Sequence, residues 1–423
     1  MRPRTGADFD AGSKKWYNTV VMAHQDKNQD ESESESVIVK LVTNLIRLAV
    51  INNASDIHIE PEEDKIRIRF RIDGVLREVE THPISLMEPL VARVKVLSNL
   101  DIAERRKPQD GRFQINTDNK QLDIRVSTFP TMYGENLELR ILNKTNILLG
   151  LPSLGFMPDN LAQFTTMIHQ PYGIIFVTGP NGSGKTTTLY ATLNTINTPD
   201  KDIVTLEDPV EYQLPLIRQT QVDPDAGMDF AAGLRSLLRQ DPDVILVGEV
   251  RDPETASIAV RSALTGHLVL TTLHTNDSAG AINRLVDMNV EPVLIASATV
   301  GVLAQRLVRL LCTTCAESYE ASEPLKQQLG LPANESITLK KGVGCEVCGY
   351  TGYVGRTGIF ELLAPDKQVR AMITDRASAQ DIRSYAIQHL GLRTLRDDGL
   401  AKARQGLTSV EEVLRVTAGD IVE

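Results

Sequence analysis

A glycine-rich stretch that ends in lysine and threonine lies between a predicted strand and a predicted helix. Residues 179–186 read GPNGSGKT, after the apolar run GIIFVT at 173–178 and before the helix-prone run TTLYATL at 187–193. In such a loop, glycines allow successive backbone N–H groups to converge on a phosphate chain, and the helix N-terminus adds partial positive charge. A glycine turn that ends in Lys-Thr by chance would not need a strand directly before it and a helix directly after it. The pattern therefore predicts a phosphate-binding loop in an α/β fold.

The side chains of this loop indicate how a nucleotide and its metal ion are bound. Lys185 is expected to reach the β- and γ-phosphates, and the hydroxyl of Thr186 is expected to bind Mg²⁺. The loop predicts nucleotide binding but does not by itself predict hydrolysis. The predicted nucleotide-binding residues are Gly179, Pro180, Asn181, Gly182, Ser183, Gly184, Lys185, Thr186 and Thr187.

Polar side chains stand at the ends of three further apolar runs. Glu249 ends the run that starts at Asp243, Glu207 ends the run that starts at Ile203, and His267 and His274 flank the run LVLTTL. Ligands of open α/β sheets gather at the carboxyl ends of the strands, where an acid can hold Mg²⁺ through water or orient the attacking water. An acid after one strand is more often a helix cap. Three such strands after one phosphate loop favour a shared phosphate site.

These runs resemble the motifs of a known family. VTLEDPVEY at 204–212, LRQDPDVILVGEVRD at 238–252 and LTGHLVLTTLHTN at 264–276 resemble the acidic box, the Walker B segment and the histidine box of bacterial traffic ATPases. These ATPases drive type II secretion and type IV pilus assembly. The resemblance extends over residues 37–417.

The resemblance implies a homo-hexameric cytoplasmic motor that hydrolyses ATP bound between two domains of the chain. It makes Glu207 and Glu249 the catalytic acids and His267 and His274 the histidine box, and it leaves open which acid is the general base. Asn181 stands where the family usually has threonine. That position contributes mainly its backbone, so ATP binding is still expected.

Arginines in two parts of the chain are expected to serve the same reaction. Arg125 and Arg140 alternate with apolar residues on their strands, so they point out of the core onto what pattern alone allows to be an ordinary solvated face. The resemblance implies that both face the nucleotide cleft as arginine fingers. It also implies that Arg235, Arg239 and Arg251 bind nucleotide from the ATPase domain.

All four cysteines of the chain fall into one pattern. Cys312 and Cys315 form one C-x₂-C pair, Cys345 and Cys348 form the other, and 29 residues separate the pairs. Two such pairs can offer four thiolates to one tetrahedral Zn²⁺, a closed structural site. The alternatives are free buried thiols or disulfides, and a cytosolic chain disfavours disulfides. By resemblance, these cysteines occur in secretion and pilus-assembly members and are missing from retraction motors.

Composition limits the partners and the location of the chain. With 423 residues and 42% apolar content, it is long enough for about two or three domains. A formal net charge of −10 argues against a primary nucleic-acid partner, since such binding needs a basic surface. No apolar run approaches the ~18 residues of a membrane span, and no signal peptide is visible. We therefore expect a cytoplasmic protein, and the resemblance implies that it associates with the inner membrane through partners.

The sequence divides into segments of different character. An amphipathic helix is predicted from Ile38 to Ala49, and strands follow in which apolar residues alternate with polar ones. Thr408 and Glu411 form an expected capping box of the last helix. The expected segments are a flexible acidic lead (1–36), a small α+β domain (37–145), a linker (146–160), a P-loop ATPase core (161–311), a tetracysteine zinc module (312–348) and a C-terminal strand with helices (349–423). By resemblance, the small domain is PAS-like and the core is RecA-like.

Three classes of function fit a P-loop chain. We favour an assembly motor that works with the inner-membrane platform proteins of a secretion or pilus machine. A helicase or translocase on a similar core would need a basic, aromatic-studded strip, and a non-hydrolysing switch would not need the doubled acids and histidines. Within the family, the run LAQRLVRLLC and the 29-residue cysteine gap favour secretion over pilus assembly. Residues 1–36 are too few for the extra N-terminal domain that secretion members usually carry, so the sequence leaves open how the chain is recruited to the membrane.

Overall fold

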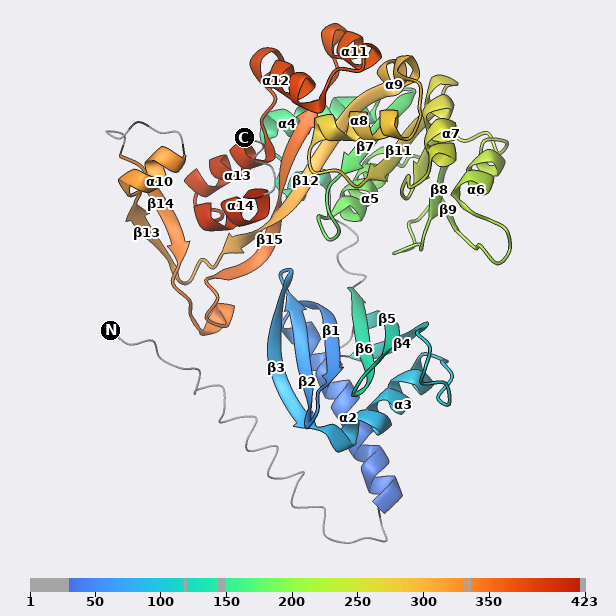
Figure 1. Cartoon of the computed structure of the whole chain (residues 1–423), viewed down its shortest axis with the longest axis vertical. Helices are drawn as coiled ribbons and strands as arrows, with labels where there is room; N and C mark the ends of the chain where they lie inside the picture. Colours follow the sequence, from blue (N-terminus) through green and yellow to red (C-terminus); the bar gives the residue numbers. More distant parts are fainter. Residues whose placement is uncertain (1–29, 118–119, 144–148, 330–331, 333–335, 419–423) are drawn as a thin grey trace. The chain divides into compact units, whose positions relative to one another are not determined.

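The computed structural model describes residues 30–117, 120–143, 149–329, 332 and 336–418 of the chain. These residues form two compact units, divided between Asn143 and Lys144 (Figure 1). Residues 1–29 of the expected lead lie outside the described residues. Helix α2 spans Asp30–Ile51, so it begins inside the segment that was expected to be flexible.

The first unit is built on an antiparallel sheet of six strands in the order β3-β2-β1-β6-β5-β4. Asp73 and Gly74 both have positive φ, and they form the two-residue turn between β2 and β3. The strands are β1 (Ala54–Pro61), β2 (Lys65–Ile72), β3 (Val75–Pro83), β4 (Gln109–Thr117), β5 (Lys120–Thr131) and β6 (Gly134–Asn143).

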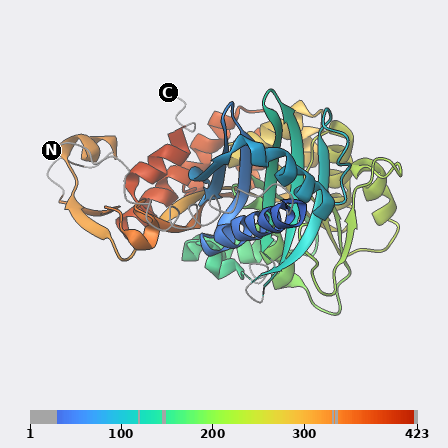
Figure 2. The same ribbon diagram turned by 90° about the horizontal axis from the view of Figure 1, so that it is seen from below.

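Two helices cover one face of this sheet, as Figure 2 shows for α2. The other helix is α3 (Met87–Leu97), preceded by the short 3₁₀ helix η1 (Ile84–Leu86). Leu45 and Ile46 of α2 are buried against Ile68 and Phe70 of β2. The helical and alternating periodicities of the sequence are both confirmed here.

The second unit contains a mostly parallel sheet of seven strands in the order β15-β12-β7-β11-β10-β8-β9. All neighbouring strands run parallel except β12 and β15. The strands are β7 (Gly173–Thr178), β8 (Ile203–Glu207), β9 (Arg218–Gln221), β10 (Val244–Val247), β11 (Leu268–Leu273), β12 (Thr299–Leu311) and β15 (Tyr353–Leu363).

Alternate residues of the central strands enter two different cores. On β10, Ile245 and Val247 belong to one cluster, whereas Val244 and Leu246 belong to the other. Both faces are therefore covered by helices, as a buried parallel sheet requires. The helices of the sheet region are α4 (Pro158–Ile168), α5 (Lys185–Ile196), α6 (Phe230–Leu237), α7 (Pro253–Leu264), α8 (Ser278–Asp287) and α9 (Pro292–Ala298).

Aspartates fix the starting points of three of these helices. The side chains of Asp229, Asp252 and Asp277 accept hydrogen bonds from backbone N–H groups in the first turns of α6, α7 and α8. Such caps satisfy N–H groups that have no partner within the helix. They set the loops that lead from the carboxyl ends of the strands into the helices.

The tetracysteine module and the C-terminal helices follow β12. The module contains β13 (Ala316–Glu320), α10 (Glu323–Gln328), β14 (Thr338–Gly342) and the 3₁₀ helix η4 (Glu346–Cys348), and β13 pairs with β14. The chain then returns along β12 as β15. The last helices are α11 (Lys367–Thr374), α12 (Ala379–Leu390), α13 (Leu395–Arg404) and α14 (Val410–Thr417).

Two details differ from the sequence expectations. The described part of the expected linker contains η3 (Leu151–Leu154) and joins the core of the second unit, because Phe156 is buried and stacks on Phe360 at a centroid distance of 3.8 Å. The cap of α14 is Ser409, whose side chain accepts from Glu412 N. Thr408 instead donates to Arg309 O at 2.7 Å.

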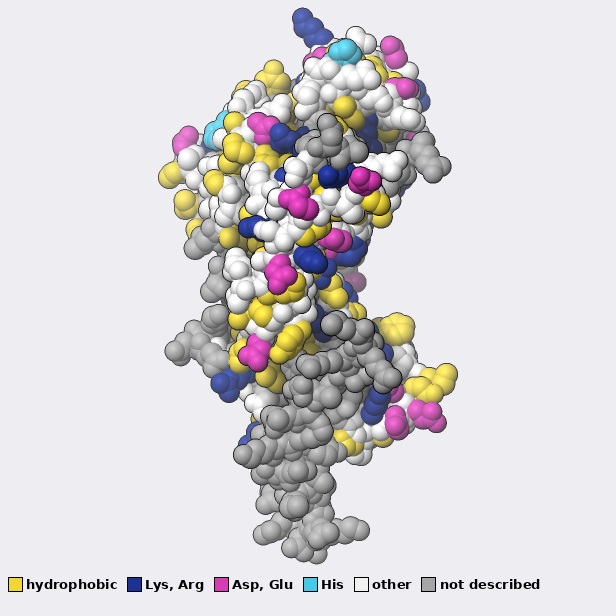
Figure 3. All heavy atoms as spheres, turned by 90° about the vertical axis from the view of Figure 1, so that its left-hand side faces the viewer, with side chains coloured by type: hydrophobic (Ala, Val, Ile, Leu, Met, Phe, Trp, Pro, Cys, Tyr) yellow, Lys and Arg dark blue, Asp and Glu magenta, His cyan; other side chains and the backbone are white. Residues whose placement is uncertain are grey.

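The surface of the second unit carries charges of both signs. On the face drawn in Figure 3, acidic and basic side chains of the described residues lie among one another. Within the described part of the chain, no helix combines the length and the apolar character that crossing a membrane requires.

Candidate functional site

The glycine-rich loop lies between β7 and α5 at the carboxyl edge of the parallel sheet. Gly179, Gly182 and Gly184 all have positive φ, which side chains with a Cβ rarely adopt. A Cβ at position 179 would also lie 2.4 Å from Gln305 O and 2.7 Å from Ser183 Oγ. The loop thus needs glycine both for its turns and for its close packing against β12.

The N-terminus of α5 is suited to bind a negatively charged ligand. Gly184 is the N-cap and supplies no side-chain hydrogen bond to the first turn. Ser183 Oγ is buried and has no hydrogen-bond partner among the described residues. Uncapped N–H groups at a helix N-terminus and an unsatisfied hydroxyl fit a nucleotide phosphate chain. Thr186 and Thr187 are exposed at the same helix end, where a hydroxyl can reach Mg²⁺.

Lys185 folds back over the loop. Its Nζ donates to Gly179 O at 2.8 Å and to Pro180 O at 3.1 Å. Burial lowers the pKa of Lys185, and the nearby Glu249 carboxylate opposes that shift. The structure therefore brings the loop lysine and the acid that follows β10 into one electrostatic environment.

Glu249 is held by side chains from two loops. His274 Nε2, after β11, lies 3.2 Å from Glu249 Oε2, and Arg251 forms an ion pair with Oε1. The hydrogen bond to Glu249 raises the pKa of Arg251. Lys185, Glu249, Arg251 and His274 thus converge at the carboxyl edge of the sheet.

Glu207 has a different environment at the end of β8. Its carboxylate is buried and accepts hydrogen bonds from Tyr190 OH, from Thr205 Oγ1 at 2.6 Å and from Gln219 Nε2 at 3.2 Å. Tyr190 also accepts a hydrogen bond from Glu211 N at 3.2 Å. Glu207 is therefore tied to α5 and to the loop that follows its own strand.

Three other residues that were predicted for the site make their contacts elsewhere in the second unit: His267, Arg235 and Arg239. His267 precedes β11, at the edge of the sheet opposite His274, and its Nδ1 lies 2.9 Å from Ser262 O. Arg235 forms an ion pair with Glu254 in the first turn of α7. Arg239 donates to Arg235 O at 2.8 Å. The grouping of both histidines at one phosphate site is corrected: a strand separates them.

Arg125 and Arg140 belong to the first unit, where they are cross-strand neighbours on β5 and β6. Arg140 is exposed and forms ion pairs with Asp56 at 2.8 Å and with Glu138 at 3.5 Å. Both arginines lie on the polar side of the sheet, as the alternation indicated.

The four cysteines gather into one cluster. Their sulfur atoms all lie within 4.8 Å of one another, and three pairs are 3.8 Å apart. A tetrahedron with Zn–S bonds of ~2.3 Å has edges of ~3.8 Å, whereas a disulfide bond is ~2.05 Å long. The geometry fits one four-thiolate zinc site and does not fit disulfides.

Two backbone N–H groups approach one sulfur atom of this cluster. Cys345 N and Gly352 N each lie 3.2 Å from Cys348 Sγ. Burial opposes the charged form of Cys348, but these N–H donors and the thiols of Cys345 and Cys315 together outweigh it and lower the pKa of Cys348 to about 6, whereas burial raises the pKa of Cys315 to about 12. Gly344, Gly349 and Gly352 have positive φ, which gives the tight turns that bring the two pairs together.

Three residues of the site were not identified from the sequence: Tyr190, Gln219 and Gln305. Tyr190 lies four residues after Thr186 on α5, and that helical spacing was the available signal. Gln305 interrupts the apolar run that forms β12, and its Nε2 donates to Ser183 O at 2.8 Å. For Gln219, the sequence carries no signal that distinguishes it from other strand glutamines.

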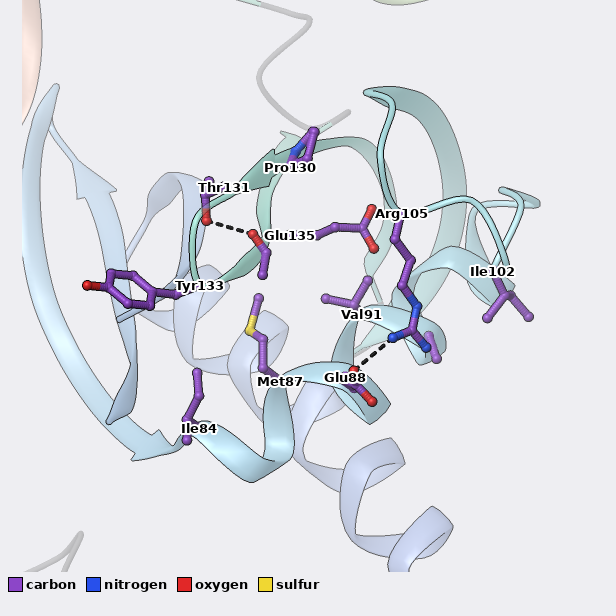
Figure 4. Close-up of a pocket in the computed structure, with 12 residues that line it drawn as sticks. Ile84, Met87, Glu88, Val91, Ile102, Arg105, Pro130, Thr131, Tyr133 and Glu135 are labelled. Carbon is purple, nitrogen blue, oxygen red and sulfur yellow. Dashed lines mark hydrogen bonds and ion pairs between the residues drawn. The ribbon is translucent and has the colours of Figure 1, made fainter. Parts of the chain in front are cut away.

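A separate pocket of about 410 Å³ lies in the first unit, between α3 and the β5–β6 hairpin (Figure 4). Met87 and Val91 form part of its apolar wall, and Arg105 and Glu88 form an ion pair of 2.7 Å at its side. Glu135 also lines it and pairs with the fully buried Lys95 at 2.7 Å.

Comparisons with known proteins identify the family of the chain. Residues 31–415 match the family model of the type II/IV secretion system protein. The type II secretion system ATPase E of Vibrio cholerae is 48% identical over 97% of this chain and 81% of its own length. The type II secretion system protein E of Dickeya dadantii is 51% identical over 92% and 77%. The type IV pilus assembly ATPase PilB of Thermus thermophilus is 49% identical over 90% of this chain and 43% of its own length.

Solved structures share the fold. The Legionella pneumophila ATPase DotB has a TM-score of 0.66 at 23% identity and covers 90% of this chain and 95% of its own. The pilus retraction motor PilT, solved with bound ADP, has a TM-score of 0.59 at 25% identity and covers 88% and 95%. The predicted α/β fold with a P-loop ATPase domain and a helical C-terminal region is confirmed. The chain belongs to the type II/IV secretion system protein family, as an ATP hydrolase similar in sequence to the type II secretion system protein E.

Proposed function

We propose that the chain hydrolyses ATP at the loop between β7 and α5 and that this hydrolysis powers protein export by a type II secretion system, through assembly of a pseudopilus. The observation that carries the proposal is the convergence of Lys185, Glu249 and His274 at the carboxyl edge of one parallel sheet. A lysine for the phosphates and an acid held in place beside it are the parts that phosphoryl transfer to water requires.

The two acids take different roles in this proposal. Glu249 is the acid that orients the attacking water, because it lies close to Lys185 and is held by His274 at one carboxylate oxygen and by Arg251 at the other. Glu207 is buried and already accepts three side-chain hydrogen bonds, so we assign it to supporting the loop after β8 and the water shell of Mg²⁺. Mg²⁺, when bound, neutralises charge on the transferred phosphoryl group. Thr186 is the side chain that would hold it.

The arginines complete the site through closure or assembly. Arg251 already pairs with Glu249, whereas Arg235 on α6 and Arg239 in the turn after it are exposed and can reach a nucleotide held by another subunit. Arg125 and Arg140 would act as fingers on closure of the first unit. His267 has no part in the phosphate site of its own chain in this proposal, since it lies at the opposite edge of the sheet.

The same function sets the expected assembly and partners. A homo-hexamer that works at inner-membrane platform proteins, and that stays in the cytoplasm at the membrane surface, fits a motor of this kind. The zinc module would be structural, because a closed four-cysteine site keeps no open position for substrate. ATP, Mg²⁺ and Zn²⁺ are the cofactors of the proposal, and nucleic acid is not a primary partner.

Type IV pilus assembly is the second candidate, favoured by the 49% identity to the Thermus ATPase. The 51% identity to the Dickeya secretion protein E favours secretion as the first candidate.

Two experiments test the proposal. Lys185→Ala should abolish ATP turnover, and turnover that stays at the wild-type level would contradict the assigned site. Pull-down with the full chain should recover the platform protein of a secretion machine. Recovery of the platform protein of a pilus machine instead would assign the chain to pilus assembly. If single-stranded DNA stimulated the ATPase, a nucleic-acid translocase would become the better assignment.

A further inference from the structure

Gln305 lies where β12 stops pairing with β7. The parallel ladder between these strands ends at the pair Ala304–Thr178, while β12 continues beside β15, with Gln305 opposite Phe360. The phosphate loop begins at the next residue of the other strand, Gly179. Gln305 is therefore the first residue of β12 that borders the loop instead of the strand.

The loop packs directly on this glutamine. Gln305 is buried, with 2% of its surface exposed, and its Nε2 donates to Ser183 O at 2.8 Å. A Cβ at position 179 would lie 2.4 Å from Gln305 O, and one at position 184 would lie 3.2 Å from Gln305 Nε2. Both ends of the loop thus meet the main chain or the side chain of one residue.

The hydrogen bond to Ser183 O also determines the direction of an N–H group. Ser183 C=O and Gly184 N–H belong to one planar trans peptide, in which the two groups point in opposite directions. When the carbonyl is turned toward Gln305, the N–H of Gly184 is turned away from β12, toward the open side of the loop. That N–H group stands at the N-cap of α5, where anions bind.

We propose that Gln305 is a positioning residue of the phosphate loop: its side-chain amide fixes the Ser183–Gly184 peptide so that the N–H of Gly184 faces the phosphate chain. This inference rests on the proposed function, in which this loop binds ATP. Gln305 does not touch the reacting atoms. It acts through the peptide, so its effect belongs to nucleotide binding more than to the chemical step.

The test compares Gln305→Met with Thr299→Val in the full-length chain. Met keeps the length and the burial of glutamine but cannot donate a hydrogen bond. Thr299 is also buried on β12 and donates to Ile295 O at 2.7 Å, so its variant is a matched control that loses a buried hydrogen bond away from the loop. The measurements are the Kd of a fluorescent ATP analogue, KM and kcat for ATP, the Tm without nucleotide, and the zinc content.

Gln305→Met should raise Kd and KM about tenfold, the effect expected of one buried carbonyl without its donor, and should change kcat less than threefold. Thr299→Val should lower the Tm but leave Kd unchanged. If Gln305→Met lowers the Tm in the same way and binds ATP as tightly as the wild type, the residue is only structural and the inference is wrong.

A second variant tests the inference in case Gln305→Met does not fold. Gln305→Glu has the same number of heavy atoms and replaces the donor with an oxygen, so at pH 8 it should weaken binding at least as much as Gln305→Met. Wild-type affinity in a folded Gln305→Glu protein would also overturn the inference. A wild-type chain that fails to bind ATP would instead overturn the proposed function, so the two failures are distinguishable.

Discussion

His274 Nε2 lies 3.2 Å from Glu249 Oε2, and this contact joins the loops that follow β11 and β10 at the carboxyl edge of the sheet. Glu249 is 14% exposed, whereas His274 is 45% exposed, so the acid is shielded and the histidine is not. Because Arg251 holds the other carboxylate oxygen, Glu249 has little freedom to turn. An acid fixed in this way beside the phosphate loop is suited to orient a water molecule.

We predict that Glu249→Gln lowers kcat at least ~100-fold while the Kd for ATP changes less than about threefold. An amide of the same size cannot accept a proton, but it leaves the phosphate loop intact. Steady-state kinetics and titration of a fluorescent nucleotide measure the two effects. Glu291→Gln, an exposed acid that precedes α9, is the control and should behave like the wild type.

Glu207→Gln separates the roles of the two acids. Its amide N–H₂ group would face either Tyr190 OH, which now donates to Oε2, or Thr205 Oγ1 and Gln219 Nε2, which now donate to Oε1. The Tm should therefore fall together with turnover. Glu249→Gln should not lower the Tm. Equal losses of turnover and equal Tm values in both variants would contradict the division of roles.

Elemental analysis should find one zinc ion per chain, bound by the four cysteines. Cys345→Ser should lose the metal and make residues 312–348 sensitive to protease, while nucleotide binding stays within about threefold of the wild type, because the site is closed and structural. Limited proteolysis with mass spectrometry gives the readout. Protein prepared under reducing conditions that contains no metal would contradict the prediction.

The sequence predicted those parts of the site that depend on local patterns. The phosphate loop, the acids after β8 and β10, and the paired cysteines each occupy a short stretch whose geometry follows from its own residues. The predicted grouping of His267 with His274 overlooked the strand between them. His267 precedes that strand and His274 follows it, so only His274 lies at the carboxyl edge of the parallel sheet.

The hydrogen-bond network of the site was also outside the reach of sequence patterns. Tyr190 and Glu207 are joined across 17 residues, and Gln305 and Ser183 across 122. Such pairs form because the fold packs a helix or a strand beside the loop. No spacing in the sequence therefore shows which two residues will be hydrogen-bonded to each other. The burial of Phe156 in a segment that was expected to be a linker has the same origin, since its partner Phe360 lies far along the chain.

The pocket of the first unit offers a test of buried charge. Lys95 is fully buried, and its Nζ contacts Glu135 and donates to Glu104 O at 2.6 Å. Glu135→Gln would leave the lysine charge without its counter-ion, so the free energy of unfolding should fall by about 3–5 kcal/mol. Glu88→Gln breaks the exposed pair with Arg105 in the same pocket and should cost ~1 kcal/mol or less (Figure 4). Chemical denaturation measures both, and equal effects would contradict the prediction.

Glu412 should make the stability of the second unit depend on pH. Burial opposes its charged form, but hydrogen bonds from Arg415 and Arg309 outweigh burial and lower the pKa of Glu412. Glu412 Oε2 lies 2.7 Å from Arg309 Nη2, and Oε1 lies 2.7 Å from Arg415 Nη2. Since the pKa is lower in the folded chain, the stabilisation is complete above the unfolded value of ~4.3 and is lost as the pH falls through the folded value.

Glu412→Gln should therefore lower the free energy of unfolding by about 1–3 kcal/mol at pH 7, because an amide gives weaker hydrogen bonds to two guanidinium groups. The difference from the wild type should stay constant from pH 7 to about 5 and should shrink below pH ~4.3, where Glu412 of the unfolded wild type takes up a proton and the folded carboxylate still does not. Thermal unfolding of both proteins between pH 3.5 and 7 measures this difference. Both proteins carry the same cysteines and the same remaining acids, so the difference isolates Glu412. A difference that does not change down to pH 3.5 would show that the carboxylate charge is not what stabilises α14 against β12.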